Sequence, residues 1–162
     1  MSNGPDFLPQ MIAMPGSWDE ILAVLYQAFE ADFKRHRTMH EGLLVLYDGR
    51  ILRDGEGKEE GFWHVISRSD RHTGERLIDY PRAQRLSWAR ALLESPPRSE
   101  IKVFDFDEGP KDTGIRRYIW LEASDYALVL QRKKQVYHWV TAFCVTSNWK
   151  RTDLRKRYEN RV

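Results

Sequence analysis

Four segments in the second half of this chain are rich in β-branched and aromatic residues, and short stretches of turn-forming residues separate them. The segments are residues 101–106, 116–122, 126–131 and 136–145. Such runs, joined by turns like Gly109 to Gly114, are typical of strands that pair with their neighbours along the chain. We therefore expect an antiparallel sheet of about four strands in this half of the molecule.

The first third of the chain has a helical pattern instead. Ser17 is a typical N-cap residue, and Glu20 completes a capping box three positions later. Apolar residues then recur at three- and four-residue spacing as far as Phe33, which predicts an amphipathic helix. A further helix is expected from Pro81 to about Glu94, because proline suits the first turn of a helix.

The segments between these helices are shorter and less regular. Residues 43–47 predict a strand, and the Asp-Gly pair at 48–49 is a hairpin signal after which residues 51–53 can return. Residues 59–67 are compatible with a helix or a strand, and we favour a short helix or an irregular turn. Residues 69–80 are polar and predict a mobile loop.

Together these elements predict an α+β fold in which N-terminal helices pack on a C-terminal antiparallel sheet, with a basic helix over residues 148–160 at the end. At 162 residues, 41% hydrophobic and 12% aromatic, the chain is long and apolar enough for one domain with its own core. We expect residues 1–16, rich in Gly and Pro, to be a flexible lead-in and residues 17–162 to be the domain. The sheet face that the helices leave uncovered can stay open and host a site.

Cysteine usage and hydropathy bound the environment of the protein. Cys144 is the single cysteine, so no intramolecular disulfide and no thiolate metal cluster can form, which favours a cytoplasmic location. The uninterrupted apolar runs are only a few residues long, too short to cross a membrane. Residues 1–15 lack the basic start of a signal peptide.

Charge is unevenly distributed along the chain. Residues 1–60 contain 6 Lys and Arg against 11 Asp and Glu, a net charge of −5, whereas residues 61–162 contain 20 against 13, a net charge of +7. A basic C-terminal part permits a polyanionic partner such as a nucleic acid. The alternative is an ordinary solvated charged surface.

His64 is the leading candidate for chemistry. Its unperturbed pKa of about 6.5 lets an imidazole donate or accept a proton at neutral pH. Phe62 and Trp63 are expected to shield it partly, which would favour its neutral form. Ser67 and Arg68 follow and can hold an anion. The alternative is a buried structural histidine that is hydrogen-bonded to the backbone.

The helix that begins at Pro81 and the last strand supply further candidates. Arg82 and Arg85 fall near the apolar stripe of the helix, where they can bind an anion or lay their stems on the core with their heads in water. Period-two alternation in the strand gathers four side chains on one face: Tyr137, Trp139, Thr141 and Phe143. Thr141 can hydrogen-bond a phosphate oxygen and Tyr137 can stack a base. The alternative is that this row is the core face.

Other polar residues carry weaker signals. Glu122, at a strand end, can act as a general base or pair with an arginine, and we favour the pairing. Lys133 and Lys134, with the basic C-terminal helix, form a basic edge whose binding to phosphates would be salt-sensitive. His36 and His40 have the spacing of helical metal ligands but lack the glutamate of a zincin motif. Without a glycine-rich phosphate loop or dinucleotide fingerprint, we expect no cofactor and no metal.

Taken in order, several of these features resemble a phage-associated branch of the barnase–EndoU–colicin–RelE nuclease fold, over roughly residues 30–160. The features are Phe62-Trp63-His64-Val65-Ile66-Ser67, the helix with Arg82, Arg85 and Trp88, the strand Trp120-Leu121-Glu122 with Asp125-Tyr126 after it, and Tyr137 leading to Val140-Thr141-Ala142-Phe143. The resemblance implies a barnase- or RelE-like α+β domain. Phe143 stands where such motifs more often have a tyrosine, so a phenol is lost there.

The resemblance also implies a function, that of a metal-independent, toxin-like endoribonuclease from a mobile element. A ribose 2′-hydroxyl would attack the adjacent phosphate and leave a cyclic phosphate, a reaction that needs proton transfer and cations. His64 would be the acid or base, Arg82 and Arg85 would stabilise charge, and Thr141 would hold a phosphate oxygen. No second histidine matches. Five residues are expected to bind substrate: Arg68, Arg117, Glu122, Lys134 and Tyr137.

The expected partners are RNA and an immunity or antitoxin protein. Two other functions stay open on the same fold: a nucleic-acid-binding module without catalysis, and a protein-interaction domain that uses the acidic N-terminal third. Catalysis requires His64 and an arginine over one cleft. Binding needs only a basic face with exposed aromatic residues, and an interaction domain would show an apolar patch of several hundred Å².

Overall fold

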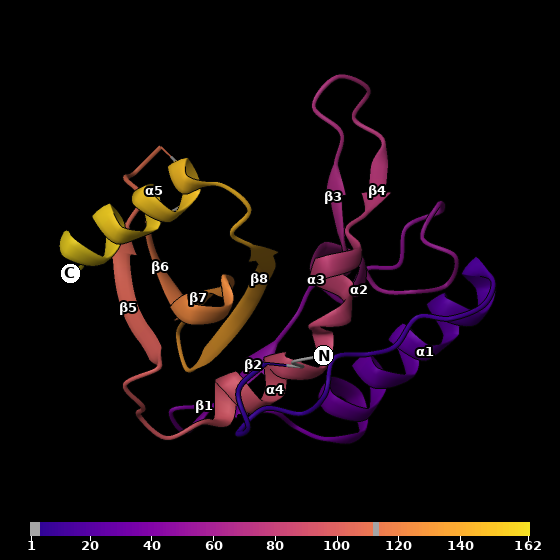
Figure 1. The fold of residues 1–162 in the computed structure, drawn as a ribbon, viewed down its shortest axis with the longest axis horizontal. Coiled ribbons are helices and arrows are strands. Elements are labelled where there is room, and N and C mark those ends of the chain that lie inside the picture. Colours follow the sequence, from indigo (N-terminus) through magenta and orange to yellow (C-terminus); the bar gives the residue numbers. More distant parts are fainter. Residues whose placement is uncertain (1–3, 112–113) are drawn as a thin grey trace.

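A computed structural model describes residues 4–111 and 114–162, and Figure 1 shows its fold. The α+β class and the N-terminal helix are confirmed, but the main sheet is curled and mixed, with six strands in the order β1-β2-β8-β7-β6-β5. Its strands are β1 (Met39–His40), β2 (Leu43–Leu46), β5 (Ile101–Asp107), β6 (Ile115–Leu121), β7 (Tyr126–Lys133) and β8 (Val136–Cys144). The α-helices are α1 (Trp18–Glu30), α2 (Glu60–Ile66), α3 (Tyr80–Gln84), α4 (Leu86–Glu94) and α5 (Asn148–Glu159).

The C-terminal strands arise as their composition indicates. β5 to β8 pair antiparallel with their sequence neighbours, from Ile101 opposite Leu121 to Tyr126 opposite Cys144. Residues 112–113 of the expected turn, like residues 1–3 of the expected lead-in, lie outside the described residues.

The expectation of about four strands is wrong because the N-terminal half extends the sheet. β2 lies parallel to β8, with Val45 opposite Tyr137, and β1 pairs antiparallel with β2. The Asp-Gly pair at 48–49 does not form a hairpin, and residues 51–53 form no strand. The carbonyls of Asp48 and Arg50 instead accept hydrogen bonds from Gly61 and Glu60, both at 2.8 Å. These bonds satisfy free N–H groups at the start of α2.

Gly61 is required by this close approach of α2 to the chain after β2. A Cβ atom at Gly61 would lie 2.8 Å from the Tyr47 Cβ and 3.0 Å from the Asp48 nitrogen. We expect Gly61→Ala to lower the free energy of unfolding by about 2 kcal/mol, as overpacking does. Gly49→Ala is the matched control, with nothing within 4 Å of its Cβ and an expected change of less than about 0.5 kcal/mol. Urea unfolding of both variants measures the difference, and equal stabilities would contradict the assigned contact.

Side chains on the two faces of the sheet build two separate cores. Ile119 and Leu121 of β6 belong to the larger core, which α1, α2, α3 and α4 cover. Tyr118 and Trp120 belong to a smaller core on the other face, closed by Leu154 of α5. The expectation of an open sheet face is therefore wrong, because the C-terminal helix covers that face (Figure 1).

Residues 4–16 form no helix or strand, but they pack against α4. Leu8 is buried, and the Trp88 indole nitrogen donates to the Pro9 carbonyl at 2.9 Å. The Ile12 amide donates to the Gln84 carbonyl at 2.8 Å. This contact lies where the expected helix from Pro81 to Glu94 divides into α3 and α4, at Arg85.

The segment expected to be a mobile loop forms a second, two-stranded sheet. β3 (Ser67–Ser69) pairs antiparallel with β4 (Arg76–Ile78), and this hairpin projects away from the main sheet (Figure 1). Asp70 stabilises the turn by accepting hydrogen bonds from the amides of His72 and Thr73, at 2.8 and 2.9 Å. The short helix favoured for residues 59–67 is confirmed as α2, and β3 follows it directly.

Candidate functional site

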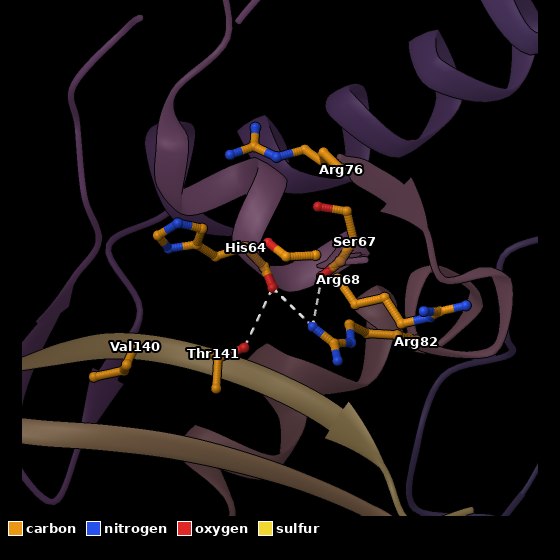
Figure 2. Close-up of a pocket in the computed structure, with 8 residues that line it drawn as sticks. His64, Ser67, Arg68, Arg76, Arg82, Val140 and Thr141 are labelled. Atoms are coloured by element: carbon orange, nitrogen blue, oxygen red, sulfur yellow. Dashed lines mark hydrogen bonds between the residues drawn. The ribbon is translucent and has the colours of Figure 1, made fainter. Parts of the chain in front are cut away.

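A pocket of about 400 Å³ lies between the end of α2, the β3–β4 hairpin, α3 and the middle of β8 (Figure 2). Its lining is His64, Ser67, Arg68, Ser69, Arg76, Arg82, Val140 and Thr141. Four of the candidates selected from the sequence thus meet at one place: His64, Arg68, Arg82 and Thr141. They come from three chain segments that are far apart in sequence.

The His64 side chain is exposed, so the expectation that Phe62 and Trp63 shield it is wrong. Successive residues of a helix are turned by about 100°, and α2 therefore directs Phe62 and Trp63 into the core while His64 faces the pocket. In Figure 2 the imidazole extends toward Val140 and away from the Arg82 guanidinium. Because the ring is exposed, a solute in the pocket can contact it directly.

The backbone of His64 is fixed by two neighbouring elements. Its carbonyl accepts a hydrogen bond from Arg82 Nη1 at 3.2 Å, and the Thr141 hydroxyl lies 3.3 Å from the same oxygen (Figure 2). Arg82 Nη1 also donates to the Ser67 carbonyl at 2.6 Å. A guanidinium at the end of a helix satisfies carbonyls that have no partner within the helix. Arg82 therefore connects the end of α2 to α3 by hydrogen bonds, and Thr141 connects the same end of α2 to β8.

Thr141 reaches the pocket because β8 contains a bulge. Val129 pairs with Thr141 but Leu130 pairs with Trp139, so Val140 is an extra residue in β8. A bulge of this kind reverses the alternation of side chains beyond it. Trp139 lies in the larger core, whereas Phe143 packs on the smaller one. The expectation that Tyr137, Trp139, Thr141 and Phe143 share one face is therefore wrong.

The pocket is lined by three guanidinium groups and no carboxylate. Arg76 forms an ion pair with Glu60 at 2.9 Å, and Arg82 has a looser one with Asp79 at 3.5 Å. Arg68 is exposed and has no ion pair among the described residues. Burial lowers the pKa of Arg82, and the negative charge of Asp79 opposes part of this shift.

Three of the residues expected to bind substrate line a different pocket, at the end of the sheet where β7 turns into β8. They are Arg117, Lys134 and Tyr137, and Asp105 and Arg132 lie beside them. Arg117 donates to Asp105 at 2.9 Å and to Glu41 at 2.5 Å, and its guanidinium lies 5.3 Å from the centre of the Tyr137 ring. Its charge is therefore compensated, and the structure does not bring it to His64.

Two other candidates lie outside both pockets. Glu122 accepts hydrogen bonds from Lys102 at 2.5 Å and from Arg155 at 3.2 Å, the kind of pairing that the sequence favours. Arg85 donates to the Pro81 carbonyl at 2.8 Å and lies 5.2 Å from the centre of the Trp88 ring. Arg76 and Ser69 of the pocket were missed in the sequence, because their part of the chain was expected to be a loop.

His40 is a buried histidine beside Arg117. Its Nδ1 atom lies 2.8 Å from the Leu93 carbonyl and its Nε2 atom 3.3 Å from Arg117 Nη1, so the neutral ring donates to the first and accepts from the second. Burial lowers the pKa of His40 below 6.5, against the opposing charges of Glu41 and Asp105. The unfolded chain then binds the proton more readily, and stability is lost as pH falls below about 6.5.

We expect the wild-type free energy of unfolding to fall more steeply between pH 7.5 and pH 5.5 than that of His40→Gln. Urea unfolding at several pH values measures the two slopes, and His72→Gln serves as an exposed control. Equal slopes for wild type and His40→Gln would show that this ring does not contribute to the acid sensitivity.

Comparison with known proteins supplies no relative: no family model, no curated protein and no solved structure matches the chain. Within the described residues, no helix has both the length and the apolar character needed to cross a membrane. In the same residues, no three His, Cys, Asp or Glu side chains are grouped so that they could hold a metal ion.

Proposed function

We propose that the protein is a metal-independent endoribonuclease that cleaves RNA in the His64 pocket. The observation that supports this proposal is the meeting of an exposed imidazole with three guanidinium groups in one pocket. An imidazole can carry a proton at neutral pH, and guanidinium groups hold phosphate oxygens with paired hydrogen bonds. The resemblance to toxin-like nucleases points to the same chemistry.

The reaction needs one bond to form and one to break. The 2′-oxygen of a ribose bonds to the adjacent phosphorus, and the bond from phosphorus to the 5′-oxygen of the next nucleotide breaks, which leaves a 2′,3′-cyclic phosphate. His64 accepts the proton of the 2′-hydroxyl and returns it to the departing 5′-oxygen. Arg68, which is exposed and has no ion pair within residues 4–111 and 114–162, stabilises the additional negative charge on the phosphate oxygens.

Arg82 and Thr141 act through His64 in this proposal. Their hydrogen-bonding groups already point at the His64 and Ser67 carbonyls, so they position the end of α2. Arg85 is left out of the reaction because it does not line the pocket.

A nucleic-acid-binding module without catalysis is the second candidate. One observation favours it: the lining contains one imidazole and no carboxylate, so a single group must serve both proton transfers. Salt-sensitive binding of RNA that stays intact would support this candidate.

Incubation of the purified protein with single-stranded RNA in EDTA tests the proposal. We expect fragments that end in a 2′,3′-cyclic phosphate and begin with a 5′-hydroxyl. The matched control is the same RNA with 2′-O-methyl groups, which lacks the attacking hydroxyl and must remain intact. Cleavage of the methylated RNA, or no cleavage of the unmodified RNA, would refute the proposed reaction.

A further inference from the structure

Trp149 is the most exposed large apolar side chain of the described residues, with 75% of its surface accessible. Four of the other five tryptophans are buried, and Trp18 is half-buried. Trp149 lies in the first turn of α5, at the end of that helix nearer the β3–β4 hairpin (Figure 1). A flat indole held on a helix in solvent presents a face on which a nucleic acid base can stack.

The residue next to Trp149 carries a charge that no carboxylate in the described part of the chain compensates. Lys150 has no ion pair among the described residues, whereas Arg151, Arg155 and Arg157 of the same helix pair with carboxylates at 2.7, 3.2 and 2.5 Å. The Lys150 ammonium lies 4.9 Å from the centre of the Phe143 ring. The ammonium group and the phenyl ring are therefore close together, and the exposed indole belongs to the residue before this lysine in the first turn of α5.

This group is connected to the His64 pocket along β8. Val140 lines the pocket, and both Val140 and Phe143 pack on the smaller core, on the sheet face that α5 covers. At about 3.3 Å per strand residue, Phe143 lies about 10 Å along the strand from Val140. Phe143, Lys150 and Trp149, here called the β8–α5 strip, therefore lie at the end of β8 beyond Val140 and in the first turn of the helix that follows.

We propose that the β8–α5 strip binds single-stranded nucleic acid next to the His64 pocket, with Trp149 stacking on a base and Lys150 contacting a phosphate. That this single-stranded nucleic acid is RNA rests on the proposed function. An indole stacks on any base, so this subsite confers affinity for single strands with little sequence preference. Paired bases cannot offer a face to Trp149, which makes duplex a poor ligand.

Quenching of tryptophan fluorescence by iodide tests the subsite without any cleavage, because Trp149 is the one exposed tryptophan among the described residues. The probe is a 2′-O-methyl RNA of eight nucleotides. We expect it to protect the wild-type fluorescence from iodide, and the same sequence as a duplex to give little protection. Absence of protection at saturating oligonucleotide would overturn the proposal, and protection by an unrelated acidic peptide would point to a protein partner instead.

Variants give the size of the effect. We expect Trp149→Ala to bind the oligonucleotide about 5- to 150-fold more weakly, the usual range for one stacked base, and Trp149→Phe to retain most of the affinity. Ile51→Ala, another exposed apolar position, serves as the control and should bind like wild type. If Trp149→Ala cleaves RNA and binds the oligonucleotide as tightly as wild type, the β8–α5 strip is refuted and the proposed ribonuclease is not. If the oligonucleotide protects the wild-type fluorescence but the wild type cleaves no RNA, the ribonuclease is refuted and the strip is not.

Discussion

His64→Ala is expected to cleave RNA about 100- to 10,000-fold more slowly than wild type, the range usually lost with a general acid or base. The pocket lining contains no second imidazole and no carboxylate, so no neighbour can replace the imidazole. The change should leave the fold intact because the side chain is exposed. Rates measured in EDTA with excess enzyme over RNA report the loss.

The matched control for this experiment is His72→Ala. His72 is exposed and lies in the turn of the β3–β4 hairpin, where only its backbone amide is used, in the bond to Asp70. Its cleavage rate should equal that of wild type. Equal rates in wild type and His64→Ala would remove His64 from the mechanism, and any cleavage would then need another site.

Arg82→Met is expected to lower the free energy of unfolding by about 3 kcal/mol. The Arg82 side chain is only 12% exposed, and its Nη1 atom donates to the carbonyls of both His64 and Ser67. Hydrogen bonds from charged groups contribute about 1.5 to 3 kcal/mol each, and methionine retains the apolar stem while removing both. Denaturant unfolding measures the loss, and an unchanged stability would mean that Arg82 is free to serve the substrate instead.

Arg68→Met provides the contrast, since Arg68 is exposed and unpaired among the described residues. Its stability should change by less than about 0.5 kcal/mol. Its affinity for RNA should fall. The slope of log affinity against log salt concentration should decrease in magnitude by about 1, the contribution of one phosphate contact. Together the two variants separate an arginine that holds the fold from one that contacts the ligand.

Local chemistry explains which parts of the fold could be predicted from the sequence. Ser17 caps α1 through its side chain, and the four C-terminal strands pair with their neighbours, because both features depend on nearby residues. The parallel pairing of β2 with β8 joins segments about 90 residues apart, and no turn residue signals it. The Asp-Gly pair at 48–49 even suggests a hairpin, but the start of α2 takes the backbone groups that a hairpin would need.

The candidate site also combines features that local sequence predicts with features that only the tertiary structure shows. His64, Arg68, Arg82 and Thr141 could be selected by residue type, and the tertiary structure brings them to one pocket. Residue type alone does not show that Arg117 is already paired with Asp105 and Glu41. Strict alternation also misplaces Thr141, because a single bulge residue changes the face of every side chain after it.

The double anchoring of the His64 carbonyl has a consequence for motion. A donor from α3 and one from β8 meet at this oxygen, so the end of α2 cannot unwind without breaking contacts to two other elements. The imidazole is left with rotation about its own side-chain bonds, which takes picoseconds to nanoseconds at exposed positions. The backbone of His64 is therefore fixed while its imidazole samples rotamers quickly. Orienting the imidazole toward a bound phosphate would cost little more than the conformational entropy of one side chain.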